Sequence, residues 1–448
     1  MNTSEALAGL PALPALERDW QLAARTDPWL LHDIRHAVDG PFHLLYPEQF
    51  ADNLRAFQRV LADHEVRGQV YFGKKANKAG CWLPEVAALD AGVDVASVPE
   101  LVHALAAGVR GCDIGVTGAA KSDELLRLAV RHGSVIAVDA LDELERLAAV
   151  ATAAAPVRVL LRRLPPGAPH SRFGLSDSEL RSALERCLGL PQLRMIGFSF
   201  HLDGYEAAPR AELAYESIRM SVAARRAGLP ITALSIGGGF ACRYVSDADW
   251  TEFEDRRTGE WFHAGKHFEK FYPYAQGPTG PDMLAAILAA EFDGRTLAAH
   301  LRRHELEVFL EPGRALLIDA GFTVFPVLGF KQHDAHGITT VQGLSMSLSE
   351  QWKGSEFLPD PILVPASADR EPRPVYSCVG GSSCMEYDVL TWRKVRMSQR
   401  PAHGDLLLYP NTAGYQMDKN ESEFHQLPLP PKIVLSHRDG RPRWRLDR

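Results

Sequence analysis

The segment QVYFGKKANKAG, residues 69–80, closes a short apolar run with two adjacent lysines and a turn of small and amide residues. It is the first of eight apolar, β-branched runs that end in small or polar residues. The other seven are GVDVAS (92–97), DIGVTG (113–118), SVIAVDA (134–140), VRVLLRR (157–163), MIGFSFHL (195–202), LSIGGGF (234–240) and EVFLEPG (307–313). Segments between the runs, such as PELVHALAAG (99–108), carry apolar residues at helical spacing. Strands that alternate with helices predict a parallel sheet, and eight such units predict a closed (β/α)8 barrel.

An open, doubly wound sheet is the competing topology for the same pattern. Functional residues gather at one switch point in an open sheet, but they surround the whole mouth of a barrel. Here candidate functional residues end nearly every run, among them Lys75, Asp94, His201 and Glu311. The sequence therefore predicts the α/β class with a TIM-like barrel over residues 45–320.

The pattern of predicted helices and strands changes after about residue 320. Strand-like pieces with Gly and Pro turns follow, such as FTVFPVLGFK (322–331) and RPVYSCVG (373–380), with little helix between them. This pattern predicts a C-terminal β domain over residues 321–448. We expect the N-terminal segment, residues 1–44, to contribute to that domain, because GPFHLLY (40–46) resembles an entering strand. A long insertion at about 243–282 is expected to act as a lid, a binding element or an oligomer contact.

Composition excludes several classes of protein. The chain has 448 residues, a hydrophobic content of 46% and a formal net charge of -7, which argue against nucleic acid or an anionic membrane as a partner. No apolar run approaches the ~20 residues needed to cross a bilayer. The first residues lack a basic region followed by an apolar core, so we expect a cytoplasmic protein. The six cysteines show no CxxC or CxxH spacing, so we expect neither a disulfide framework nor a metal site.

Lys75 is the candidate nucleophile of the first run. Strand alternation places Tyr71, Gly73 and Lys75 on the face opposite to that of Lys74, and we expect Lys75 to point into the barrel. A partly desolvated lysine with a lowered pKa can form a Schiff base. The alternative is an ordinary pair of surface lysines.

Three further segments carry candidate residues, each with a plainer alternative. SIGGGF (235–240) offers backbone N–H groups suited to a phosphate, although glycine runs are usually turns. EPGR (311–314) places a carboxylate and a guanidinium after the eighth run, or forms a simple turn. Cys384 is either a reactive thiol or an inert buried one, and His201 is either functional or structural. The run at 421–425 is expected to be solvated.

Together these motifs resemble the fold-type III pyridoxal 5'-phosphate decarboxylases, the family of ornithine, diaminopimelate and biosynthetic arginine decarboxylases. The resemblance runs from about residue 41 to 420 and extends to a siderophore-pathway or rhizobial-type subgroup. It is carried by KKAN, DVAS with PE, HLDG, the GGG triplet, EPGR, GSSC and AGYQ. The residues that it implies as cofactor ligands are Lys75, Asp94, Ser97, His201, Gly237, Gly238, Gly239, Glu311, Arg314 and Tyr415, with Glu100 nearby.

The resemblance implies an alanine racemase-like barrel with a C-terminal β domain, in a homodimer whose active sites lie at the interface. It implies decarboxylation of an L-amino acid or an amino-acid conjugate through a Schiff base on Lys75. In this scheme His201 stacks on the pyridine ring and Glu311 pairs with the ring nitrogen. Cys384 is the implied proton donor to Cα, and Met385, Glu386 and Asp388 are the implied substrate-binding residues.

Three departures from the family pattern concern the substrate. Met385 stands where the family has an acid that reads a distal ammonium group, so a diamino acid bound in the usual way is not expected. Asp203 and Gly204 stand where glycine and a phosphate-binding serine are expected, so Asp203 should turn away from the phosphate or contact substrate. The insertion carries basic residues that could meet a carboxylate-rich substrate: Arg256, Arg257, His263, Lys266 and His267.

Two other functions remain open on the same motifs. An amino-acid racemase or epimerase would need a second base opposite the lysine. A non-catalytic carrier of pyridoxal phosphate would need only the barrel.

Overall fold

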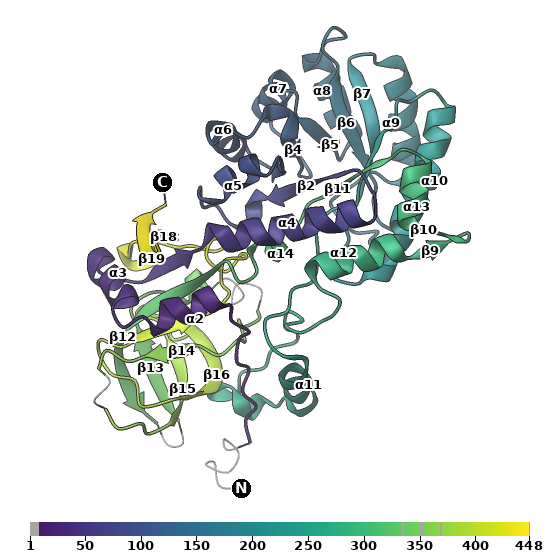
Figure 1. Ribbon diagram of the computed structural model, residues 1–448. Helices are drawn as coiled ribbons and strands as arrows, with labels where there is room; N and C mark the ends of the chain where they lie inside the picture. Colours follow the sequence, from purple (N-terminus) through teal and green to yellow (C-terminus); the bar gives the residue numbers. More distant parts are fainter. Residues whose placement is uncertain (1–8, 334–335, 349–353, 368–369, 448) are drawn as a thin grey trace.

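The computed structural model describes residues 9–333, 336–348, 354–367 and 370–447, which fold into two parts (Figure 1). Eight parallel strands close into a barrel, and a second, mainly antiparallel sheet lies beside it. The closed barrel confirms the fold class predicted from the eight runs, and the open doubly wound alternative is wrong.

The barrel strands correspond one to one with the predicted runs. In the closed order β11-β2-β3-β4-β5-β6-β7-β8, they are β2 (Gly68–Gly73), β3 (Gly92–Val95), β4 (Ile114–Val116), β5 (Val135–Val138), β6 (Val157–Arg162), β7 (Leu193–Ser199), β8 (Ala233–Ser235) and β11 (Glu307–Leu310). A small cluster of buried side chains fills the barrel interior, made of Tyr71, Val135, Ala137, Leu160, Ile196, Ala233 and Phe309. Because this cluster packs the interior, ligands have access only at the mouth where the runs end.

Helices surround the barrel and bury its outer face. They are α4 (Pro47–Asp63), α5 (Trp82–Ala88), α6 (Val98–Ala106), α7 (Asp123–Arg131), α8 (Leu141–Val150), α9 (Asp177–Gly189), α10 (Ala207–Arg226), α12 (Gly280–Ala289), α13 (Leu297–Arg303) and the short α14 (Arg314–Leu317). Several begin at a serine whose hydroxyl accepts a backbone N–H bond from the third residue of the helix, as Ser122 and Ser176 do. Within the described ranges, no helix is long and apolar enough to cross a membrane.

The second sheet joins strands from both ends of the chain. Its order is β16-β15-β13-β12-β1-β18-β19, with β17 pairing to β12 and β14. The strands are β1 (Phe42–Leu45), β12 (Gly321–Gln332), β13 (Gly337–Val341), β14 (Ile362–Val364), β15 (Val375–Gly380), β16 (Val389–Met397), β17 (Leu406–Tyr409), β18 (Lys432–Arg438) and β19 (Arg441–Leu446). The helices α2 (Asp19–Thr26) and α3 (Leu30–Val38) add Trp20 and Leu31 to the core under this sheet. The exact domain boundaries stay a prediction.

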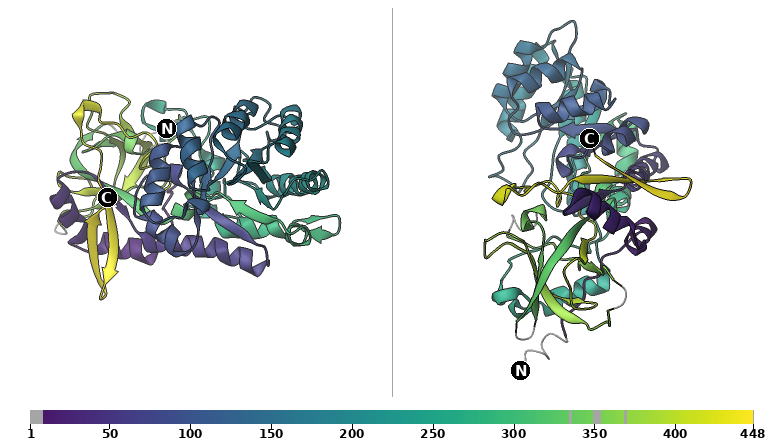
Figure 2. Two further views of the ribbon diagram at one scale, coloured as in Figure 1. Left: turned by 90° about the horizontal axis from the view of Figure 1, so that it is seen from above. Right: turned by 90° about the vertical axis from the view of Figure 1, so that its left-hand side faces the viewer.

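The C-terminal hairpin β18–β19 extends away from the body of the sheet, as the two views in Figure 2 show. Its first strand pairs in parallel with β1, and β1 pairs antiparallel with β12. The N-terminal strand therefore lies between two strands from the far end of the chain.

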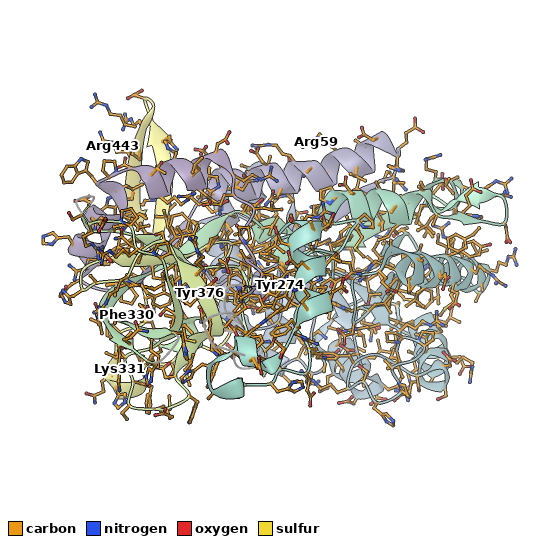
Figure 3. All side chains as sticks on the ribbon, turned by 90° about the horizontal axis from the view of Figure 1, so that it is seen from below. Arg59, Tyr274, Phe330, Lys331, Tyr376 and Arg443 are labelled. Atoms are coloured by element: carbon orange, nitrogen blue, oxygen red, sulfur yellow. The ribbon has the colours of Figure 1, made fainter. Side chains whose placement is uncertain are left out.

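The insertion docks on the β domain. It contains α11 (Asp247–Arg256), η3 (Gly259–Trp261) and η4 (His263–Gly265), and Phe262 makes a β-bridge to Arg393 of β16. Tyr274 is buried and lies where the two parts of the molecule meet (Figure 3). Its hydroxyl donates to the carbonyl oxygen of Glu356, 3.0 Å away.

The basic residues of the insertion make contacts away from the barrel mouth. Arg256 pairs with Glu252, and the Lys266 ammonium lies 5.0 Å from the ring centroid of Trp392. Neither residue lines a cavity that opens at Lys75, His201 and Glu311. That the basic residues of the insertion meet the substrate stays a prediction.

The backbone of β7 leaves no room for a side chain at Gly197. An added Cβ atom would lie 1.9 Å from the carbonyl oxygen of Ala233 in β8. We expect Gly197→Ala to lower the free energy of unfolding by about 3 kcal/mol, because neighbouring strands of a closed barrel cannot separate freely. Urea unfolding measures the change. The control Gly189→Ala, at the open end of α9, should change stability by less than about 0.5 kcal/mol, and equal effects would contradict the packing argument.

Candidate functional site

The two lysines of the first run have different environments. β2 ends at Gly73, and Lys74 begins a 3-10 turn, η1 (Lys74–Ala76), so strict strand alternation stops before Lys75. The Lys74 side chain is buried, and its Nζ donates to the carbonyl oxygens of Lys78 (2.5 Å) and Ala79 (3.1 Å), with Asn77 at 3.5 Å. Burial lowers the pKa of Lys74 to about 8. Lys74 therefore shapes the turn, and Lys75 is left to face the cavity.

The β domain holds this turn from the other side. The backbone N–H of Tyr415 donates to the carbonyl oxygen of Ala76 at 2.8 Å, and the Asn77 side-chain amide donates to the carbonyl oxygen of Ala413 at 2.8 Å. Near the chain end, the Asp447 carboxylate accepts the backbone N–H groups of Gly80 and Cys81, at 2.6 and 2.9 Å. The lysine turn is thus fixed where the two parts meet.

Lys75 lies among acidic groups at the barrel mouth. Its side chain reaches solvent through the cavity, yet the surrounding protein still desolvates the amine and by itself would lower the pKa. Nearby groups led by Asp94, with Tyr415 and Glu311, outweigh this effect, so the pKa of Lys75 is raised. The expectation that the pKa of Lys75 is lowered is therefore wrong for the protein without a bound ligand.

Asp94 is a buried carboxylate that can act as an acid or a base. It accepts a hydrogen bond from Thr117 Oγ1 at 2.7 Å. Burial, reinforced by Glu311 and opposed by Lys75, raises the pKa of Asp94 to about 7. The group can therefore gain or lose a proton near neutral pH.

His201 is neutral at physiological pH. Its Nδ1 lies 3.0 Å from the carbonyl oxygen of Leu202. Burial, followed by the charges of Lys75 and Arg162, lowers the pKa of His201 to about 3. The ring therefore offers an uncharged face at the mouth.

The glycine triplet leaves space that side chains would fill. An added Cβ atom would lie 2.6 Å from the Phe200 carbonyl oxygen at Gly237, and 2.4 Å from the Glu311 carbonyl oxygen at Gly238. Gly239 has a φ of 78°, and its added Cβ atom would approach the guanidinium of Arg210 to 2.9 Å. These positions therefore require glycine.

Arg210 is a buried cation behind the triplet, and no motif in the sequence singles it out. It comes from α10, and its Nη1 donates to the carbonyl oxygen of Ile236 at 2.7 Å. Burial lowers its pKa to about 10, and Glu311 opposes the shift. The guanidinium adds positive potential beside a loop suited to an anion.

The EPGR residues face the same mouth. Ser235 Oγ donates to Glu311 Oε1 at 2.6 Å. The Arg314 Nη1 donates to Tyr244 Oη at 3.1 Å, and the guanidinium lies 4.4 and 5.1 Å from the ring centroids of Tyr272 and Tyr415. The Glu311 carboxylate and the Arg314 guanidinium are thus held in fixed positions by neighbouring side chains.

Two cavities meet at Lys75, His201 and Glu311, which line both of them. The smaller, about 260 Å³, continues past Gly239, Gly313, Arg314 and Tyr415. The larger, about 1130 Å³, continues past Arg162, His170, Arg172 and Asp203. Asp203 thus lies on the side away from the glycines, and Gly204 has a φ of 120°, which a serine there would not readily adopt.

Two predicted site residues make structural hydrogen bonds within the chain. Ser97 is the N-cap of α6, and its hydroxyl accepts the N–H of Glu100 at 3.3 Å. Asp388 is buried, and its two carboxylate oxygens accept the N–H groups of Ser345 (2.7 Å) and Ser383 (3.1 Å). Neither lines the two cavities. The assignments of Asp388 to the substrate and of Ser97 to the cofactor stay predictions.

Cys384 lies on the loop between β15 and β16, away from both cavities of its own chain. The thiol is exposed, so the alternative of an inert buried cysteine is wrong. The loop also carries Met385, half-buried, and Glu386 and Tyr387, both exposed. His425 is exposed, as expected, and its Nε2 lies 3.2 Å from Cys384 Sγ.

The orientation of the His425 ring follows from a second contact. The backbone N–H of Cys384 donates to the same Nε2 at 3.3 Å, so this nitrogen carries the lone pair. An unprotonated Nε2 can also accept the thiol proton of Cys384. His425 has a φ of 60°, a rare conformation that no local sequence signal predicts.

Comparison with known proteins identifies relatives of the whole chain. A family model described as "Pyridoxal-dependent decarboxylase, pyridoxal binding domain" matches residues 48–270. The uncharacterized protein y4yA of Sinorhizobium fredii is 36% identical over 92% of each chain. A diaminopimelate decarboxylase of Halalkalibacterium halodurans is 24% identical over 87% of this chain and 85% of its own length.

A solved structure shares the fold. The crystal structure of SrLDC in complex with PLP and cadaverine has a TM-score of 0.70 and 20% sequence identity, covering 90% of this chain and 93% of its own. Both the barrel and the β domain therefore belong to an architecture already seen in solved structures.

The two neighbouring lysines should respond differently to removal of the amine. Lys74→Met should lower the free energy of unfolding by about 3 kcal/mol, because it leaves buried carbonyl oxygens without their donor. Lys75→Met, a matched change at the amine that faces the cavity, should lower the free energy of unfolding by less than Lys74→Met does. Urea unfolding of the two variants measures both values, and the reverse order would refute the assignment of structural and functional lysines.

Proposed function

Because this chain belongs to the fold-type III pyridoxal-dependent decarboxylases, a family of pyridoxal phosphate carboxy-lyases, we propose that it decarboxylates an L-amino acid or an amino-acid conjugate. One observation carries this proposal: Lys75, His201 and Glu311 line both cavities at the barrel mouth. A group that binds in the smaller cavity would present its reactive end at Lys75, where the larger cavity begins.

The residues of the smaller cavity fit pyridoxal phosphate. Gly239, Gly313 and the neighbouring glycines leave open the space that a phosphate needs, and Arg314 and Tyr415 line the same end. Lys75 would hold the aldehyde, and Glu311 would face the ring nitrogen. When bound, the cofactor supplies an electron sink for the electrons released with CO2.

The surrounding residues would hold charge and protons in defined places. Glu311, fixed by Ser235, would keep a proton on the ring nitrogen. His201, being neutral, would stack on the ring without adding a cation beside Lys75. Asp94, with a pKa of about 7, would accept or return the proton of Lys75 Nζ.

Cys384 would complete the site from a second copy of the chain. It lies outside both cavities of its own chain, on a loop whose Tyr387 side chain is 65% exposed. A homodimer that buries this loop would bring Cys384 Sγ to the mouth of the other barrel. There the thiol would return a proton to Cα after CO2 leaves, and His425 Nε2 would orient that proton.

The larger cavity bears on the substrate class. Its lining includes Arg162, His170 and Arg172, with Asp203 as a nearby acid. Met385 cannot balance a distal ammonium group, whereas arginine side chains suit carboxylates. We therefore favour an amino acid whose far end carries carboxylates over a diamino acid.

Product analysis in D2O tests the reaction. With the correct member of a panel of diamino acids, ordinary L-amino acids and citrate conjugates, mass spectrometry should detect CO2 and an amine labelled with deuterium at the former Cα. Lys75→Met should give no product. Inversion at Cα without CO2 would replace the proposal with a racemase. A bound cofactor that leaves every substrate unchanged would favour a carrier.

The thiol–imidazole pair has a test that does not need the reaction. Alkylation of Cys384 by iodoacetamide, followed over pH by peptide mass spectrometry, should slow by about tenfold at neutral pH in His425→Asn, because the base beside the thiol is removed. Cys112, the other exposed thiol, is the control within the same protein. Equal rates in wild type and variant would contradict a role for His425.

A further inference from the structure

Three potential metal ligands from distant parts of the chain meet on the β domain. His263 comes from η4 of the insertion, His336 precedes β13, and Cys378 lies in β15. One nitrogen from each ring and the Cys378 sulfur all lie within 4.8 Å of one another. Among the described residues, this cluster is the group of His, Cys, Asp and Glu side chains placed closely enough to hold a metal ion.

The separation of the two imidazoles matches a tetrahedral ion. His263 Nδ1 and His336 Nε2 lie 3.4 Å apart. Two nitrogens bound at 2.0–2.1 Å to tetrahedral zinc lie about 3.4 Å apart, which follows from the bond length and the tetrahedral angle. An imidazole–imidazole hydrogen bond is the competing explanation for this distance alone.

The third group separates the two explanations. The Cys378 side chain is 1% exposed, and its Sγ lies 3.3 Å from the carbonyl oxygen of Trp392. A hydrogen bond between two histidines needs no buried thiol beside it, whereas two imidazoles and a thiolate form a donor set that suits zinc. The absence of a carboxylate from the set disfavours magnesium and calcium.

We propose that His263, His336 and Cys378 bind a zinc ion that fastens the insertion to the β domain. Binding releases the thiol proton to solvent, and water fills the fourth position. The neighbouring contacts support a fastening role: Phe262 bridges to Arg393, and Lys266 packs on Trp392. Cys378 lies in the strand that leads directly into the loop of Cys384, so the ion would also steady that loop.

Cobalt binding provides the test. Full-length protein treated with a chelator should bind one Co²⁺ per chain, with a sulfur-to-cobalt charge-transfer band that zinc then abolishes. Cys378→Ser should remove the band, and His263→Ala should weaken Co²⁺ binding by about 100-fold or more. His333→Ala and Cys384→Ser are the matched controls, a nearby imidazole and a nearby thiol outside the cluster, and both should bind as wild type does.

A second measurement covers variants that fold poorly. Zinc should raise the thermal midpoint of the wild type and of both controls, but not that of Cys378→Ser or His263→Ala. Absence of stoichiometric Co²⁺ binding, or an unchanged band in Cys378→Ser, would overturn the proposal. Neither measurement uses substrate, so failure here leaves the proposed decarboxylation untouched.

Discussion

The site depends on one buried ammonium group. Lys74 Nζ binds carbonyl oxygens of the turn that follows it, and the chain must fold back sharply for those oxygens to converge. This turn presents Lys75 to the cavity. Its backbone groups also form hydrogen bonds with Tyr415 and Asp447 of the β domain. A buried lysine is usually a cost, but here its three N–H donors meet carbonyl acceptors. The buried ammonium of Lys74 therefore sets the position of Lys75, the proposed reactive lysine.

Around Lys75 the protein balances desolvation against charge. Burial drives Asp94 toward its neutral form and His201 toward its neutral form, but it fails to neutralise Lys75, because Asp94 and Glu311 lie close by. The mouth thus combines a protonated amine, a carboxyl group that titrates near neutrality and an uncharged ring. Groups with such different proton affinities can exchange protons over short distances. They do not all have to be charged at the same time.

The barrel was predictable because each strand carries its own signal, an apolar run that ends in polar residues. The glycines at 237–239 were visible as a triplet at the end of such a run, although the groups that leave no room for side chains there belong to other segments. Features that depend on distant segments were not predictable. Strand alternation could not show that Lys74 starts a 3-10 turn, nor that Asp388 accepts the N–H groups of Ser345 and Ser383. The pairing of His425 with Cys384 joins segments that share no periodicity.

The position of β1 has a consequence for synthesis of the chain on the ribosome. This apolar strand leaves the ribosome early, yet its two neighbours begin at Gly321 and Lys432, after the whole barrel. Until then both edges of β1 lack their backbone partners, a state that favours association with other chains. We therefore expect nascent chains to rely on chaperones until the last strands emerge.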